Sequence, residues 1–193
     1  MLNLPHGSIR NALFLIGTLT AAARIAPAQA LVTAQRGAEI APFAQATLLS
    51  PDWGPTSNFG YTVGVDYSRF IRSIVQPSIE LRMTNAGGST VGEKTYLGGL
   101  KLQTSIHRVR PYVVVLGGQG YITFTHPSSP SYTGDNSFVL SIAGGARFPV
   151  TSQLDLTADY SWQKWNLDPQ TLNPTTLGVG VAYRIPFHTG RVQ

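Results

Sequence analysis

The feature that most constrains the fold is an alternation, with a period of two residues, of apolar side chains with polar or very small ones. In residues 153–163, for example, Leu154 and Leu156 alternate with Asp155 and Thr157. A strand places successive side chains on opposite faces, whereas an amphipathic helix needs a period of 3.6. Glycine, threonine and β-branched residues interrupt every helical pattern after the N-terminal segment. The chain is therefore predicted to be all-β.

Eight such segments follow one another, separated by residues typical of turns. They lie at 38–49, 59–68, 75–84, 95–104, 111–124, 138–148, 153–163 and 176–187. The connections expected after the second, fourth and sixth segments are short. Those after the others are mostly longer and rich in turn residues, namely 50–58, 85–93 and 125–137. Barrels of outer membranes alternate short periplasmic turns with longer extracellular loops in this way.

The composition favours the same arrangement. Only 12% of the residues are charged, about half the usual density in a soluble domain. After the N-terminal segment no apolar run is long enough for a transmembrane helix. Tilted strands of about ten residues with one apolar face cross the hydrocarbon layer instead. We therefore predict an eight-stranded antiparallel up-and-down transmembrane β-barrel with its apolar faces outward.

The first 30 residues have the features of a cleaved signal peptide. Arg10 precedes an apolar stretch at 11–23 that is too short to span a bilayer, and Ala28–Ala30 form a small-x-small cleavage signature. We expect residues 1–30 to be removed and residues 31–193 to form the barrel in the outer membrane of a Gram-negative-type bacterium. The leader contains two of the arginines, so the formal net charge of +5 falls to +3. Nucleic acid is not an expected partner, because the remaining basic residues are scattered.

Aromatic residues are expected at two levels of the barrel. If the short connections mark the lower end, the outward set near the upper end includes Tyr61, Tyr96, Phe124, Phe138 and Trp162. The outward set near the lower end includes Tyr67, Tyr112, Phe148, Tyr183 and Phe187. Aliphatic residues and glycine lie between the two sets. Two such belts are typical of membrane barrels, whose amphipathic rings lie at both interfaces.

The opposite, inward face carries charges of both signs. They comprise the acids Asp66, Glu80, Asp155 and Asp159 and the bases Arg82, Lys101, Arg147 and Arg184. An unpaired charge in a narrow lumen is very costly, so these residues are expected to pair. Eight strands enclose an interior just wide enough for side chains to fill it. We predict a lumen closed to solutes; a charged pathway for ions is the alternative.

One group of residues resembles a catalytic constellation. His126 and Ser128 are two residues apart in an expected upper loop, as are the histidine and serine of outer-membrane lipid A deacylases. The triad of those enzymes is completed by a glutamate, but no glutamate follows Glu93, and only Asp135 lies nearby. The four histidines form no metal-binding spacing. We expect no metal, no cofactor and no enzymatic activity.

Several segments together resemble the outer-membrane protein β-barrel domain family, the relatives of outer-membrane protein X and of the transmembrane domain of outer-membrane protein A. The resemblance is carried by Glu39–Phe43, Arg110–Val113, Gly117–Gly120, Gly144–Phe148 and Gly178–Arg184. It implies insertion by the barrel-assembly machinery and a role in envelope integrity, adhesion or immune evasion. Assembly signals of the family usually end at the final aromatic residue, whereas His188–Gln193 follow Phe187 here.

Three functions remain open on the sequence. The first is a monomeric, porin-like barrel, surrounded by outer-membrane lipid and lipopolysaccharide, with a structural or adhesive role through its extracellular loops. The second is an outer-membrane acyl hydrolase acting on lipid A. The third is a soluble periplasmic carrier of the lipocalin type, whose apolar faces would point inward. Heat-modifiable migration after detergent extraction separates the first two from the third.

Overall fold

The computed structural model describes residues 37–52, 57–69, 74–125, 133–167 and 170–187. The predicted signal peptide lies outside these residues. No helix long and apolar enough to cross a membrane occurs within them. They form the strands β1 (Ala38–Ser50), β2 (Asn58–Arg69), β3 (Val75–Gly87), β4 (Val91–Thr104), β5 (Arg110–Phe124), β6 (Gly134–Pro149), β7 (Leu154–Leu167), β8 (Gln170–Leu172), β9 (Thr175–Tyr183) and β10 (Ile185–Phe187).

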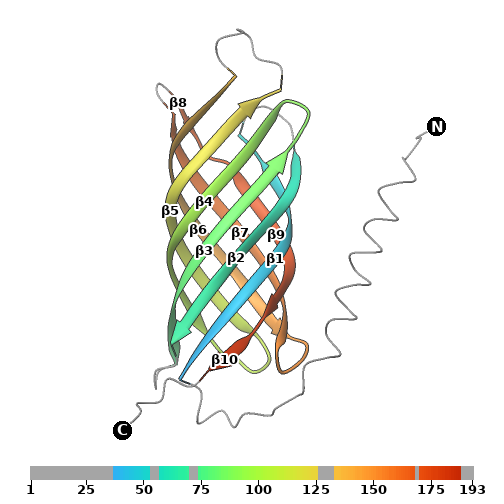
Figure 1. The fold of residues 1–193 in the computed structure, drawn as a ribbon, viewed down its shortest axis with the longest axis vertical. Helices are drawn as coiled ribbons and strands as arrows, with labels where there is room; N and C mark the ends of the chain where they lie inside the picture. Colours follow the sequence, from blue (N-terminus) through green and yellow to red (C-terminus); the bar gives the residue numbers. More distant parts are fainter. Residues whose placement is uncertain (1–36, 53–56, 70–73, 126–132, 168–169, 188–193) are drawn as a thin grey trace, which may run out of the picture. The chain divides into compact units, whose positions relative to one another are not determined.

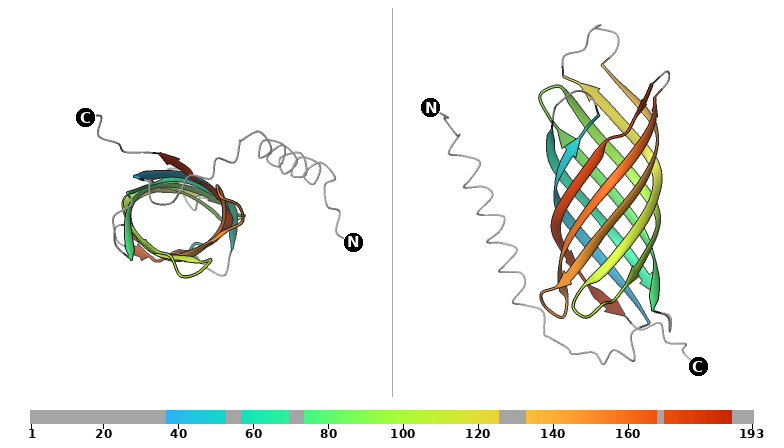
Figure 2. Two further views of the ribbon diagram at one scale, coloured as in Figure 1. Left: turned by 90° about the horizontal axis from the view of Figure 1, so that it is seen from below. Right: turned by 180° about the vertical axis from the view of Figure 1, so that it is seen from behind.

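The strands pair antiparallel with their neighbours in sequence and close on themselves (Figure 1 and Figure 2). Val179 of β9 lies opposite Ala158 of β7 on one side and Ala46 of β1 on the other. The short β8 and β10 extend the last strand, because β8 pairs with the end of β7 and β10 pairs with the start of β1. The predicted closed eight-stranded antiparallel barrel is thus confirmed, with its last strand in three pieces.

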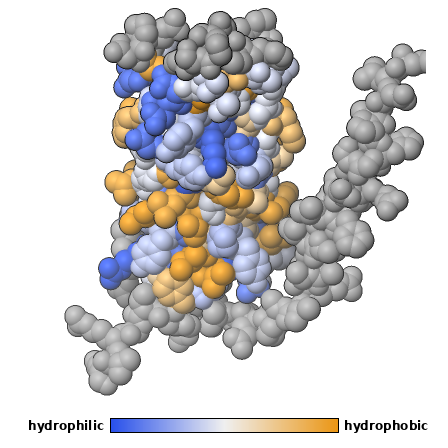
Figure 3. All heavy atoms as spheres, turned by 45° about the horizontal axis from the view of Figure 1, so that its top comes forward, coloured by the Kyte–Doolittle hydropathy of each residue, from blue (hydrophilic) through white to orange (hydrophobic). Residues whose placement is uncertain are grey.

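The apolar face of each strand points away from the barrel axis. In β7, Leu156 is 49% exposed whereas its neighbour Asp155 is 0% exposed. Val179 of β9 is 57% exposed. Figure 3 shows hydrophobic residues gathered around the barrel wall below a more polar upper end. This placement is opposite to that of a soluble carrier, and an exterior so rich in apolar side chains needs lipid around it.

The connection between β3 and β4 is much shorter than the sequence pattern indicated. The loop expected over 85–93 is a tight turn of residues 88–90, because β3 continues to Gly87 and β4 begins at Val91. The N–H of Gly88 donates a hydrogen bond to the carbonyl oxygen of Val91 at 3.2 Å. The glycine-rich sequence of 85–93 suggested a long loop, but the alternation of the two strands continues into it. The longer connections at the upper end are therefore 51–57 and 125–133.

The outward position of Val179 predicts the effect of a charge at this site. Val179 is the central residue of β9, so Val179→Arg places a guanidinium near the bilayer midplane and should lower the free energy of unfolding by about 2–4 kcal/mol. Urea unfolding in lipid vesicles measures this value, with Val179→Leu as the apolar control. Unchanged stability of the arginine variant would mean that β9 presents its other face to lipid.

Candidate functional site

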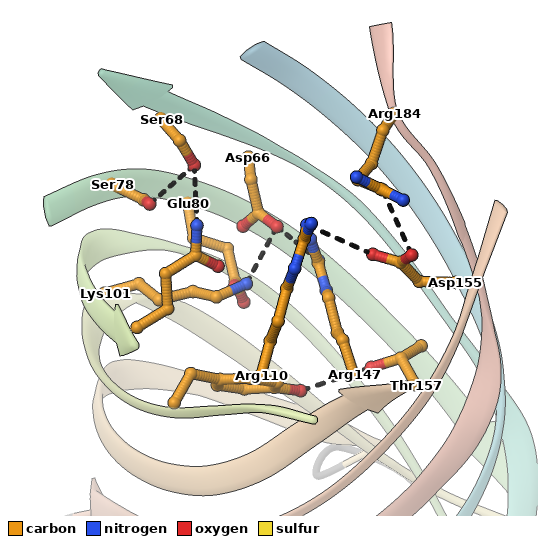
Figure 4. Close-up of polar contacts among 12 residues, drawn as sticks. Asp66, Ser68, Ser78, Glu80, Lys101, Arg110, Arg147, Asp155, Thr157 and Arg184 are labelled. Carbon is orange, nitrogen blue, oxygen red and sulfur yellow. Dashed lines mark hydrogen bonds and ion pairs between the residues drawn. The ribbon is translucent and has the colours of Figure 1, made fainter. Parts of the chain in front are cut away.

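The eight charged residues expected inside the barrel all have buried side chains, none of them more than 7% exposed. Their longest chain of contacts centres on Asp66 of β2. Lys101 donates a hydrogen bond to Asp66 at 2.8 Å, and Arg147 of β6 donates a second one. Lys101 also contacts Glu80 at 3.2 Å, and Glu80 accepts a hydrogen bond from Arg82 at 2.8 Å. This network joins four strands through the lumen (Figure 4).

Asp159 of β7 ends this network on the far wall of the barrel. Its Oδ2 atom accepts a hydrogen bond from Arg82 at 3.0 Å. The same oxygen accepts the Tyr112 hydroxyl at 2.8 Å and the Gln45 amide at 3.1 Å. Three donors on one carboxylate oxygen, from β1, β3 and β5, fix the position of Asp159 and tie distant strands together.

A second, smaller group of charges surrounds Asp155 at the lower end of β7. Its carboxylate lies 3.0 Å from Nε of Arg184 and 3.7 Å from a guanidinium nitrogen of Arg110. These contacts are ion pairs without the geometry of a hydrogen bond. Arg184 instead donates to the carbonyl oxygen of Thr151 at 3.2 Å. Figure 4 shows Arg184 and Arg110 converging on Asp155.

Two aromatic residues predicted to face lipid point inward instead. Tyr112 is 5% exposed and lies in the charge network, and Phe124 packs at the upper end against buried apolar residues. Their predicted outward position was wrong because both faces of β5 are apolar in 113–116 (Val-Val-Val-Leu), so the alternation there does not reveal its phase. Tyr121 is the aromatic residue that β5 presents outward, at 42% exposure.

The remaining residues assigned to the belts lie on the outer face. Those with large exposed fractions are Tyr61, Tyr67, Tyr96, Phe138, Phe148, Trp162 and Tyr183. Phe187 is half-buried against Tyr67, with 6.2 Å between the ring centroids. The inward Tyr112 has another role, because the Lys101 ammonium lies 4.3 Å from the centre of its ring. Such a cation–π contact stabilises a charge that has lost water.

The lumen also contains an apolar cluster that the sequence analysis did not predict. Trp165 of β7 is 1% exposed, and its Nε1 donates to Gln163 at 2.9 Å. The other members, from β4 to β8, are Val91, Leu97, Val114, Leu116, Ile122, Val139, Ala143, Leu167 and Leu172. Charged and apolar side chains together therefore fill the interior, whereas the alternation predicted polar or very small residues there.

Two buried acids were also missed, Glu39 and Glu93. Each is only 2% exposed. Neither oxygen of the Glu93 carboxylate has a hydrogen-bond partner among the described residues. The phase of β4 could have revealed Glu93, since it shares a face with Thr95, Leu97 and Lys101. The expected segment began at residue 95 and excluded it.

The catalytic candidates are only partly within the described residues. His126 and Ser128 lie outside them. Asp135 is at the start of β6 and accepts a hydrogen bond from the N–H of Asn136 at 2.7 Å. Within the part of the chain that the structure describes, no group of three or more histidine, aspartate or glutamate residues is suited to hold a metal ion.

A closed barrel with an apolar exterior and a filled lumen defines an integral outer-membrane β-barrel protein. Residues 12–184 match the model of the outer membrane protein beta-barrel domain family. The chain belongs to this family. Among curated proteins, none matches it.

Solved structures share the fold at low sequence identity. Neisserial surface protein A has a TM-score of 0.53 and 17% identity, and the match covers 78% of this chain and 97% of that one. Ail, the attachment invasion locus protein of Yersinia pestis, has a TM-score of 0.53 and 18% identity over 78% and 99% of the two chains. Ail in complex with the heparin analogue sucrose octasulfate has a TM-score of 0.52 and 17% identity, and the match covers 77% of this chain and 97% of that one.

The inward orientation of Tyr112 can be tested by removing its hydroxyl. Tyr112→Phe deletes the hydrogen bond to the Asp159 carboxylate, and we expect a loss of about 1.5–3 kcal/mol in the free energy of unfolding. Tyr121→Phe is the matched control on the same strand and should change stability by less than about 0.5 kcal/mol. Denaturant unfolding in vesicles measures both. Equal effects of the two changes would contradict the assignment of opposite faces.

The Glu93 carboxyl, which has no hydrogen-bond partner among the described residues, predicts a stabilising substitution. Glu93→Leu removes this buried polar group and places an aliphatic side chain beside Val91, so the barrel should gain about 1–3 kcal/mol in its free energy of unfolding. Glu80→Leu is the contrasting variant. It leaves Lys101 and Arg82 without one of their acids and should cost about 3–5 kcal/mol. If both variants lose stability, Glu93 has a partner that the described residues do not include.

Proposed function

We propose that the protein is a monomeric outer-membrane barrel whose lumen is closed and which acts at the cell surface through its upper connections. Its role is in envelope integrity or adhesion, and it has no enzymatic activity. The observation that carries this proposal is the filled interior. Ion pairs around Asp66, Asp155 and Asp159 and the apolar cluster around Trp165 occupy the space that a porin leaves to water.

The position of the longer connections supports a surface role. The longer ones, 51–57 and 125–133, join strands at the end of the barrel opposite to the start of β1 and to β10. In outer-membrane barrels the longer loops are extracellular. The similar fold of Ail, an attachment protein by its name, supports adhesion as the more specific role.

The chemistry of these connections suggests the kind of partner. Residues 51–57 and 125–133 contain no lysine or arginine. They therefore offer no lysine or arginine side chain to a strongly anionic partner such as the heparin analogue bound to Ail. Trp53, Tyr132 and several serine and proline residues are present instead. Such a surface suits a partner recognised by aromatic packing and neutral hydrogen bonds.

The route to the membrane forms part of the proposal. A signal peptide over residues 1–30 would export the chain, and the barrel-assembly machinery would insert it. The apolar exterior supports a final position within the outer membrane. The lumen network needs residues of one chain only, which supports a monomer.

Two measurements on the same protein test the proposal. In planar bilayers the purified barrel should give no large, stable conductance, because its lumen is filled. Cells that carry a variant with 125–133 replaced by a tight turn should adhere less to a host or abiotic surface than cells with the intact protein. A control with the lower connection 150–153 replaced should adhere normally. Steady porin-like openings, or adhesion that does not change in the first variant, would contradict the proposal.

A further inference from the structure

A row of polar side chains crosses the outer wall of the barrel near its upper end. The strand register places Tyr61 of β2 opposite Asn85 of β3, and Asn85 opposite Lys94 of β4. Lys94 in turn lies opposite Tyr121 of β5, and Tyr121 opposite Asn136 of β6. All five side chains are on the face that the apolar residues occupy lower down. The row therefore presents two phenols, two amides and one ammonium group at the edge of the lipid-facing surface.

Contacts within this row hold its groups in place. The Asn85 amide donates to the Tyr61 hydroxyl at 3.4 Å. The Lys94 ammonium lies 5.1 Å from the centre of the Tyr96 ring, and Tyr96 meets Tyr121 edge to face at 6.2 Å between centroids. In the part of the chain that the structure describes, no carboxylate forms an ion pair with Lys94. Its charge is thus positioned by aromatic rings and is available to an external anion.

An apolar groove begins at Tyr96, two residues along β4 from Lys94. Its outward lining consists of Val63, Val65, Leu81, Met83, Tyr96 and Gly98. The groove has a volume of about 480 Å³. Gly98 keeps it open, because a Cβ atom there would approach Leu81 Cδ2 to 3.0 Å. A shallow apolar groove beside a cation matches an acyl chain beneath its anionic head group.

We propose that this row and groove form a binding site for one molecule of a phosphorylated glycolipid of the outer leaflet, of the lipid A type. One phosphate lies against the Lys94 ammonium, with the Asn85 amide and the Tyr61 and Tyr121 hydroxyls as further donors. One acyl chain follows the groove past Gly98. The site relies on the orientation in the proposed function, since only an extracellular upper end places Lys94 at the outer leaflet.

A lipid fits this surface better than a protein partner does. The groove lies on the apolar outer wall of the barrel, and its lining residues come from three neighbouring strands, β2, β3 and β4. Lysine is a compact charge that binds phosphate as a point contact, and tyrosine is suited to the interface between head groups and hydrocarbon. Lys164 of β7 offers an internal comparison. It is also exposed and outward, but its neighbour on β6 is Leu140.

Native mass spectrometry of the purified full chain in detergent can test the site. The probes are bis-phosphorylated lipid A, the same lipid without phosphates, and phosphatidylglycerol. We expect one lipid A to be retained in preference to both other probes. Lys94→Gln should weaken its retention about tenfold, as expected for the loss of one charge-assisted hydrogen bond. Gly98→Leu, which fills the groove from the outside, should weaken it as well.

The control variant is Lys164→Gln, which should bind as the unmodified protein does. A variant with 125–133 shortened should also bind normally, because the site is on the strands. The adhesion of cells that carry this shortened variant therefore tests the proposed function, whereas its lipid binding tests this site. Equal losses in the two lysine variants would overturn the proposal, and so would equal retention of dephosphorylated lipid A or of phosphatidylglycerol. The far-ultraviolet circular dichroism of every variant should match that of the unmodified barrel.

Discussion

The pairing of β9 with β1 closes the ladder of backbone hydrogen bonds, and every other property of the molecule depends on that closure. Lipid offers no partner to a free N–H or C=O group, so an open sheet with these apolar faces could not remain in a bilayer. Closure also defines an inside. Once Ala46 and Val179 are opposite each other on the outer wall, the alternate residues of both strands, such as Gln45 and Gly178, are forced into a narrow lumen.

That lumen imposes its own requirement on the charges it encloses. Arg82, Lys101 and Arg147 cannot reach bulk water, and each finds a carboxylate on another strand. Phe43 and Tyr112 lie against the same cations. A buried ion pair is weak support for stability in itself, but breaking one is expensive. The network therefore resists any change that would open a pathway, and this supports the proposal that the protein acts through its outer surface and connections.

The outer wall is divided by the same geometry. Contact with hydrocarbon requires apolar residues in the band between the belts but does not select among them, so Val, Leu, Ile, Ala and Gly all occur there. Near the upper end, side chains in register across β2 to β6 change from apolar to phenol, amide and ammonium. This is the surface that we propose distinguishes a phosphorylated lipid from hydrocarbon. Neither the lumen nor the loops are needed for that distinction.

The sequence by itself determined the strands, the outward apolar faces and the inward charges, because a period of two residues is a local property of the chain. The phase of β5 was not determined, since 113–116 is apolar throughout, and Tyr112 was placed on the wrong face. The partners were decided only by the tertiary structure. Asp159 meets Arg82 across 77 residues of sequence and Tyr112 across 47, and Glu93 is left without a partner among the described residues. Which side chains meet across a lumen follows from the register and stagger of closure, and these are properties of the whole barrel.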